Sequence, residues 1–276
     1  MRARARHGGL WLWTAVVIAY MLVPIVVVVL YSFNSTRSLQ TFGGFSTRWY
    51  EEFLADDELR ASLWVSLKLA VLTVIGATVL GTLLAFGLVR YRGRFGGSAN
   101  ILMLLPMVTP EIILGVSLLL LFSQVLALDS GFTTLVIAHI TFSLSFVTVI
   151  VRSRLVALGP DLEEAAQDLG ATPLQALRLV VIPNLLPAIV GGMLLTFAIS
   201  FDDFTVSFFN SGIGEQPLPV RIYTQIKFGI SPAINAVGAT LFAVTLLTLA
   251  LALLVPRLLG RGGRGESSLG SIGDVV

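Results

Sequence analysis

The chain has 276 residues, of which 55% are apolar and only 12% charged, with 18 basic and 16 acidic side chains and no cysteine. A water-soluble domain carries about 25% charged residues, and half of that share cannot cover a protein of this size. The mean hydropathy of +0.90 is likewise too high for a water-soluble protein. Composition therefore excludes a soluble enzyme, a disordered chain, a nucleic-acid-binding protein, disulfides and thiolate metal sites, and it indicates a polytopic membrane protein.

Six stretches are apolar enough to cross a bilayer, because a hydrocarbon core of ~30 Å needs about 20 helical residues. We predict an all-α membrane protein with the spans Trp11–Tyr31, Ser62–Val89, Asn100–Ser123, Phe132–Val151, Pro187–Phe209 and Ala233–Pro256. The first apolar run is too long for a secretory signal, so we expect a retained helix. Residues 1–10 then form an N-terminal segment, 11–256 the transmembrane domain and 257–276 a flexible cytoplasmic tail.

Basic residues are distributed unevenly over the segments between these spans. With the N-terminus in the cytoplasm, the inner segments hold 12 Lys and Arg residues and the outer segments hold 5, with Lys68 near the outer end of a span. Cytoplasmic segments of membrane proteins are enriched in these residues, so we expect both termini inside. The inner group is Arg2, Arg4, Arg6, Arg90, Arg92, Arg94, Arg152, Arg154, Arg178, Arg257, Arg261 and Arg264.

The inner segment 152–186 has the pattern of two short amphipathic helices. Acids from Asp161 to Glu164 suit the first turn of a helix that ends at Gly170, and Pro173 suits the start of the next helix. By spacing alone, this segment either docks on a partner or lies on the inner leaflet.

The same segment resembles the EAA loop of ABC importer permeases. The matching residues are Glu164-Ala165-Ala166, Gly170 and Val180-Val181-Ile182-Pro183, where the family has Ile and Leu at the positions of Val180 and Ile182. The resemblance implies the type I ABC importer permease fold. It also implies a coupling helix that docks on an ATP-binding subunit, with Glu164, Ala165, Ala166, Gly170 and Pro183 as the coupling residues.

Three acids fall inside predicted spans: Glu111, Asp202 and Asp203. Such residues are costly and usually functional. On the fifth span a polar stripe suits a wet, cation-tolerant passage, and it consists of Thr196, Ser200, Asp203 and Ser207. We expect Asp203 to line this passage and Asp202, about 100° around the helix, to flank it or to pair with a partner subunit. The alternative is that the acids pair with bases and only hold the bundle together.

Two further features concern the third and fourth spans. Pro106 and Pro110 predict a kink or break in the third span, and Glu111 then begins the resumed helix, where the helix dipole favours a carboxylate. We interpret His139 as a helix-packing residue rather than a proton relay.

From about Leu22 to Leu254 the chain resembles the smaller permease subunit of spermidine/putrescine importers, most specifically at Ser200-Phe201-Asp202-Asp203. The resemblance implies that polyamines are translocated past Asp203, Asp202, Glu111, Ser200 and Trp49, although one member of that family has Asp where this chain has Glu111. Trp49 and Tyr50 could hold ammonium groups by cation–π contacts on the outer side. Equally, they could anchor the chain at the membrane surface.

The sequence lacks G-x-x-x-x-G-K-[ST], so we expect no ATP hydrolysis, catalytic residue, metal or cofactor in this chain. The resemblance implies a bacterial inner-membrane heterodimer with a second permease subunit, two subunits that bind ATP and Mg, and an extracytoplasmic polyamine-binding protein docking on segments 32–61 and 210–232. Import of another small cationic or organic solute is the alternative. An intramembrane aspartyl protease is disfavoured, because adjacent acids on one helix diverge instead of converging on one water. A structural scaffold would not explain the docking-type loop.

Overall fold

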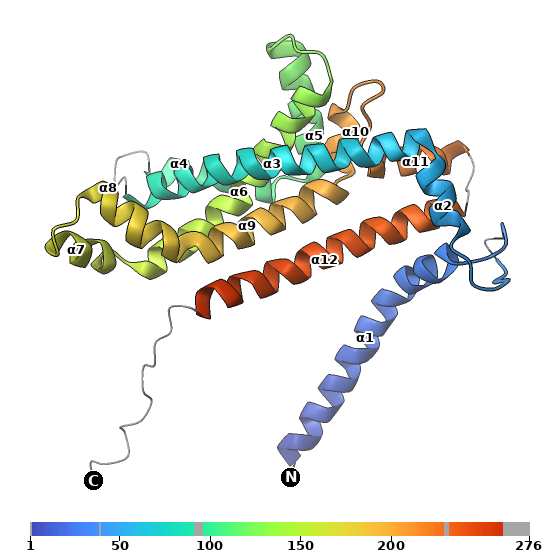
Figure 1. Cartoon of the computed structure of the whole chain (residues 1–276), viewed down its shortest axis with the longest axis horizontal. Coiled ribbons are helices and arrows are strands. Elements are labelled where there is room, and N and C mark those ends of the chain that lie inside the picture. The colour runs from blue at the N-terminus through green and yellow to red at the C-terminus, as the bar shows by residue number, and fades with distance from the viewer. Residues whose placement is uncertain (1, 39, 91–95, 229–231, 262–276) are drawn as a thin grey trace. The chain divides into compact units, whose positions relative to one another are not determined.

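The computed structural model describes residues 2–38, 40–90, 96–228 and 232–261, and these residues are almost entirely helical (Figure 1). The predicted all-α class is confirmed, since the described residues hold only one isolated β-bridge, between Asn34 and Phe45. In chain order the elements are α1 (Arg2–Ser32), α2 (Arg48–Ala55), α3 (Asp57–Arg90), α4 (Gly96–Val108), α5 (Glu111–Leu120), the π-helix η1 (Leu121–Val125), α6 (Phe132–Leu158), α7 (Asp161–Asp168), α8 (Pro173–Ala176), the π-helix η2 (Leu177–Val181), α9 (Ile182–Asp202), α10 (Thr205–Asn210), α11 (Leu218–Phe228) and α12 (Ala233–Arg261).

Among the described residues, five helical segments are long and apolar enough to cross a membrane: Trp11–Ser32, Asp57–Arg90, Phe132–Leu158, Pro173–Asp202 and Ala233–Val255. A sixth candidate is the pair Asn100–Val108 and Glu111–Val125, whose two helices are bent by 110°. Counted as one span, this pair completes the six predicted spans. The fifth span differs from its prediction at both ends, because the helix starts earlier and stops at Asp202 instead of Phe209.

Both chain ends are more helical than the sequence indicated. α1 begins at Arg2, so the first helix extends over residues 2–10, before the expected span. α12 continues to Arg261, so the first residues of the expected flexible tail are helical. The rest of that tail lies outside the described residues, as do Arg92, Arg94 and positions 229–231 of the predicted outer segment.

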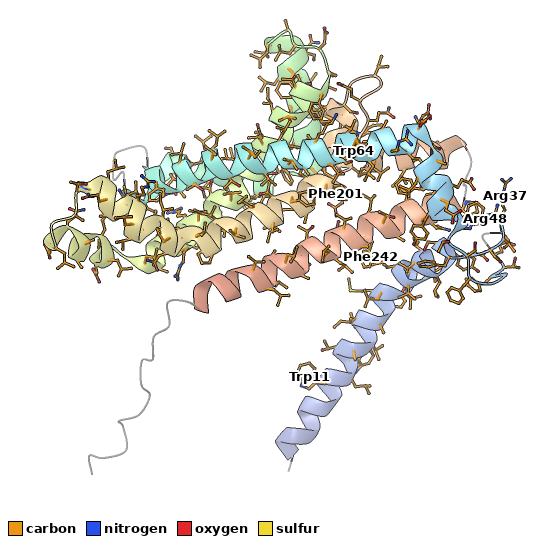
Figure 2. The ribbon with its side chains drawn as sticks, in the orientation of Figure 1. Trp11, Arg37, Arg48, Trp64, Phe201 and Phe242 are labelled. Carbon is orange, nitrogen blue, oxygen red and sulfur yellow. The ribbon has the colours of Figure 1, made fainter. Side chains whose placement is uncertain are left out.

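The chain divides into two compact units, with boundaries inside α3, directly before α11 and inside α12. The first unit comprises residues 1–64 and 218–244. One of its cores joins Phe53 and Leu59 to Leu218 and Val237. Along α1 most side chains from Trp11 onward are exposed, as Figure 2 shows for Trp11. Apart from Ser32 at its end, the candidate span in α1 therefore buries no residue in this subunit alone.

The second unit comprises residues 65–217 and 245–276, and it positions the candidate site. α6 packs along α9, and α5 packs against α10 (Figure 1). α3 approaches α6 closely because Gly81 lacks a side chain: a Cβ there would lie 2.9 Å from Val147 side-chain atoms and 3.1 Å from the carbonyl oxygen of Leu144. Small residues allow such close helix contacts in membranes.

Candidate functional site

The fifth span breaks at the two adjacent aspartates. α9 ends at Asp202, the Asp203 backbone is extended (φ −63°, ψ 125°), and α10 begins at Thr205. The Asp203 carboxylate accepts the backbone amides of Val206 and Ser207 at 3.4 and 2.8 Å, which satisfies two amides in the first turn of α10. The predicted stripe on one continuous helix is therefore wrong, because the chain turns at Asp203.

His139 of α6 joins both sides of this break. Its Nδ1 lies 2.9 Å from Ser200 Oγ, and its Nε2 lies 3.0 Å from Ser207 Oγ and 3.5 Å from Asp203 Oδ2. The side chains of His139 and Asp203 are only 2% and 7% exposed. The interpretation of His139 as a packing residue is confirmed. Asp203 thus has a basic partner within its own chain, as the bundle-holding alternative required.

The other polar residues of the expected stripe are buried inside the subunit. Thr196, Ser200 and Ser207 are each at most 3% exposed. Ser200 and Ser207 bond to the imidazole, and the described residues contain no hydrogen-bond partner for the Thr196 hydroxyl. These side chains are thus buried within this subunit, and the assignment of Ser200 and Asp203 to a passage stays a prediction.

Asp202 has the opposite environment to its neighbour. Asp202 is exposed, and its Oδ2 accepts a long hydrogen bond of 3.5 Å from the Thr245 hydroxyl of α12. The carboxylates of Asp203 and Glu111 lie close enough to repel its charge. Asp202 is therefore more exposed than Asp203, although Asp203 is the residue expected to line the passage.

Glu111 lies directly after the break in the third span. Pro110 lacks a backbone N–H and disfavours helical geometry at Thr109, which explains why α4 ends at Val108. The predicted break is confirmed. Glu111 is exposed as the first residue of α5, where the helix dipole stabilises its charge.

Trp49 belongs to the core of the first unit. The ring is 0% exposed, its Nε1 donates to the carbonyl oxygen of Asn34, and it packs against Ala233 and Ala236. Neither a cation–π site for substrate nor a membrane-surface anchor is compatible with a ring buried in this way. The chain's own Arg48 lies over this ring, with its guanidinium carbon 4.4 Å from the ring centroid.

The EAA segment (residues 161–183) folds as its sequence predicted. α7 carries three acids in its first turn and buries no residue, and Gly170 has φ +90°, which favours glycine. Thr172 and Gln175 form a capping box at the start of α8, with Pro173 in the first turn. Pro183 lies in the first turn of α9. Large apolar side chains of the segment are exposed, with Leu169 at 91% and Leu174 at 71%.

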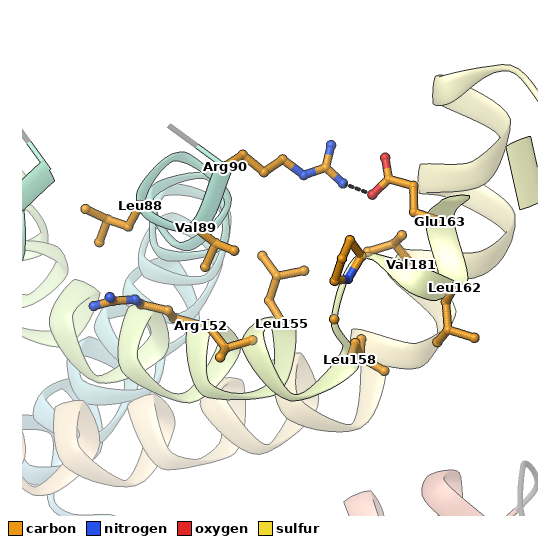
Figure 3. A pocket seen from close by; sticks show the side chains of 12 residues that line it. Leu88, Val89, Arg90, Arg152, Leu155, Leu158, Leu162, Glu163 and Val181 are labelled. Atoms are coloured by element: carbon orange, nitrogen blue, oxygen red, sulfur yellow. Dashed lines mark hydrogen bonds and ion pairs between the residues drawn. The ribbon is translucent and has the colours of Figure 1, made fainter. Parts of the chain in front are cut away.

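One contact of this segment was not predicted. Arg90 at the end of α3 donates to Glu163 of α7 across 2.5 Å, although the two are 73 residues apart (Figure 3). The charge distribution placed both residues on the same side of the membrane, but no local pattern pairs them. A second missed contact is Glu215, whose Oε2 accepts the backbone amide of Phe132 at the start of α6.

The family described as "binding-protein-dependent transport system inner membrane component" matches residues 77–260. The chain belongs to this family. It is a multi-pass permease subunit of the bacterial inner membrane, and as such it is a transport component rather than an enzyme. Members of this family work in transport systems that depend on a separate binding protein.

Named relatives cover most of the permease. The putrescine transport system permease protein PotI of Escherichia coli K12 is 40% identical over 226 residues, which are 79% of this chain and 80% of PotI. The spermidine/putrescine transport system permease protein PotC of the same strain is 36% identical over 266 residues, or 96% and 99% of the two chains. PotC of Haemophilus influenzae is 39% identical over 242 residues, or 88% and 94%.

Solved structures share the fold. A bacterial ABC transporter that imports alginate matches with a TM-score of 0.69 at 16% identity, covering 90% of the permease and 96% of that chain. An amino acid ABC transporter matches with a TM-score of 0.57 at 24% identity, covering 76% and 98%. The predicted type I ABC importer permease fold is thereby confirmed.

Proposed function

We propose that this permease conducts polyamines such as spermidine and putrescine across the inner membrane, with Asp202 as the carboxylate that contacts the ammonium groups. The observation that carries the proposal is an exposed carboxylate at the end of an apolar span, with further acids nearby. The names of the relatives support the same substrate class.

The chemistry of the acids suits a cation with several charges. The charges of Asp203 and Glu111 repel that of Asp202, so an ammonium group close to Asp202 relieves that repulsion while gaining a counter-ion. The Thr245 hydroxyl beside Asp202 offers a neutral hydrogen-bonding group. We assign Glu111 to the same passage, because it is exposed where the third span is broken.

We assign supporting roles to Asp203, Ser200 and Trp49. Asp203 and Ser200 hold His139 and the first turn of α10, and so define where the chain turns next to Asp202. Trp49 fixes the outer segment through Asn34 and α12. Removing any of them would disturb transport through the fold rather than through contact with substrate.

The proposed coupling role of the EAA segment requires further subunits in the transporter. With both termini in the cytoplasm, Glu164, Ala165, Ala166 and Gly170 face an ATP-binding subunit, and the exposed leucines of this segment supply apolar area for docking. Two such subunits would bind ATP and Mg, a second permease subunit would complete the passage, and a periplasmic polyamine-binding protein would deliver substrate on the other side.

The decisive experiment measures uptake of radiolabelled spermidine and putrescine in cells that lack this gene and the other polyamine importers. The wild-type gene should restore uptake and Asp202→Asn should not, although both proteins reach the membrane in equal amounts. Uptake that is absent with the wild-type gene would discard polyamines and favour another small cationic or organic solute. Normal uptake by Asp202→Asn would remove Asp202 from the passage.

A further inference from the structure

A pocket of about 500 Å³ lies between the ends of α3 and α6 and the start of α7 (Figure 3). Its polar lining includes Arg90, Arg152 and Glu163. Its apolar lining includes Leu88, Val89, Leu155, Leu158, Leu162 and Val181. The pocket therefore combines cationic groups with an apolar wall, which is the pattern that an anionic amphiphile requires.

Both arginines are held in place by neutral or acidic neighbours of the same unit. Arg152 donates to the Asn100 side-chain oxygen at 2.6 Å. Arg90 pairs with Glu163 at 2.5 Å, while its side chain remains 44% exposed. Since two guanidinium groups face one carboxylate in the lining, the pocket retains a net positive charge.

The pocket lies at the ends of two helices that are candidate membrane spans. Arg90 is the last residue of α3, and Arg152 lies near the end of α6, and both helices are candidate spans. The pocket therefore lies where these spans leave the hydrocarbon layer, with its apolar wall continuous with the spans. Basic pockets between membrane helices bind the headgroups of anionic lipids.

We propose that this pocket binds an anionic phospholipid, with the headgroup phosphate on Arg152 and Arg90 and an acyl chain along the apolar wall. The phosphate competes with Glu163 for Arg90, so lipid binding loosens the contact between α3 and α7. Because α7 is the first helix of the EAA segment, the lipid acts on the same element that we assign to coupling. The site itself does not depend on the polyamine proposal, since lipid binding is measured without substrate.

The test uses the complete transporter in nanodiscs that contain phosphatidylcholine and either photoactivatable phosphatidylglycerol or photoactivatable phosphatidylcholine. Peptide mapping should find labelling by the phosphatidylglycerol probe around residues 152–163, in excess over the phosphatidylcholine probe. Arg152→Gln should lower this labelling roughly tenfold or more, as expected for the loss of a charge-assisted hydrogen bond. Arg154→Gln is the matched control, because Arg154 lies on the same helix outside the pocket and donates to the Asn184 carbonyl.

Glu163→Gln supplies a test of opposite sign. This variant frees Arg90 from its carboxylate, so labelling by phosphatidylglycerol should rise above the wild-type level. Equal labelling by the two lipid probes in the wild-type protein would overturn the proposal without any variant. Equal losses in Arg152→Gln and Arg154→Gln, or displacement of the probe by inorganic phosphate, would also overturn it, the latter in favour of a soluble phosphate ligand.

Discussion

The imidazole of His139 on α6 lies 3.5 Å from the carboxylate of Asp203, the residue at which the fifth span breaks. The same imidazole also shares hydrogen bonds with the hydroxyls of Ser200, before the break, and Ser207, after it. This one buried ring therefore determines how α9 and α10 meet next to Asp202.

Replacing His139 by Leu should destabilise the permease, because it leaves the hydroxyls of Ser200 and Ser207 and the Asp203 carboxylate without their partner. An unsatisfied buried polar group costs about 1–3 kcal/mol. We expect a lower thermal unfolding temperature for the purified transporter. Thr141→Ala is the control, since Thr141 lies on the same helix and its hydroxyl donates to the Ile137 carbonyl of its own helix. An unchanged unfolding temperature for His139→Leu would contradict the packing role.

The capping role of Asp203 can be separated from its charge. Asn caps helix starts about as well as Asp, whereas Ala does not, at a cost of about 1 kcal/mol. Asp203→Asn should therefore keep most polyamine uptake, and Asp203→Ala should lose both stability and uptake. At Asp202 the charge itself is needed, so Asn and Ala should impair uptake equally. Loss of uptake in Asp203→Asn with unchanged stability would return Asp203 to the passage.

Gly170 offers a test of coupling that does not depend on steric contact. A Cβ at this position would meet nothing within 4 Å, so only the backbone angle of φ +90° restricts the residue. Gly170→Val should strain the turn between α7 and α8 and lower uptake relative to ATP hydrolysis, while Gly170→Asn should be milder. The measurement is ATPase activity and uptake in the same proteoliposomes. Equal coupling in both variants would contradict a role for this turn.

Gly81 and Gly87 form a matched pair on α3. A Cβ at Gly81 would meet Val147 and the Leu144 carbonyl, whereas Gly87 has open space around it. Gly81→Leu should separate α3 from α6 and lower thermal stability, and overpacking of this kind costs about 1–3 kcal/mol. Gly87→Ala should be neutral or slightly stabilising, because Ala is favoured over Gly in helices. Similar stability of the Gly81 variant and the wild type would show that the helices can move apart freely.

Local features of the sequence sufficed for much of the fold. Apolar run lengths predicted six spans, Pro110 predicted the break in the third span, and Gly170 with Pro173 predicted the turn in the EAA segment. Each of these depends on residues that are neighbours along the chain, because backbone hydrogen bonding, proline geometry and positive φ act locally. The ends of the helices were less predictable, as α1 and α12 continue into polar residues.

The site was decided by tertiary contacts. Helical periodicity assigned the passage to Asp203, but the chain turns there and buries its carboxylate against His139, 64 positions earlier in sequence. The sequence around Trp49 indicates a surface aromatic, but residues of α12 pack against the ring and bury it. The ion pair of Arg90 and Glu163 depends on the contact between α3 and α7. The sequence by itself thus determined which segments are helices in a membrane. Only the tertiary structure decided which charges are exposed, because exposure depends on which distant helices pack together.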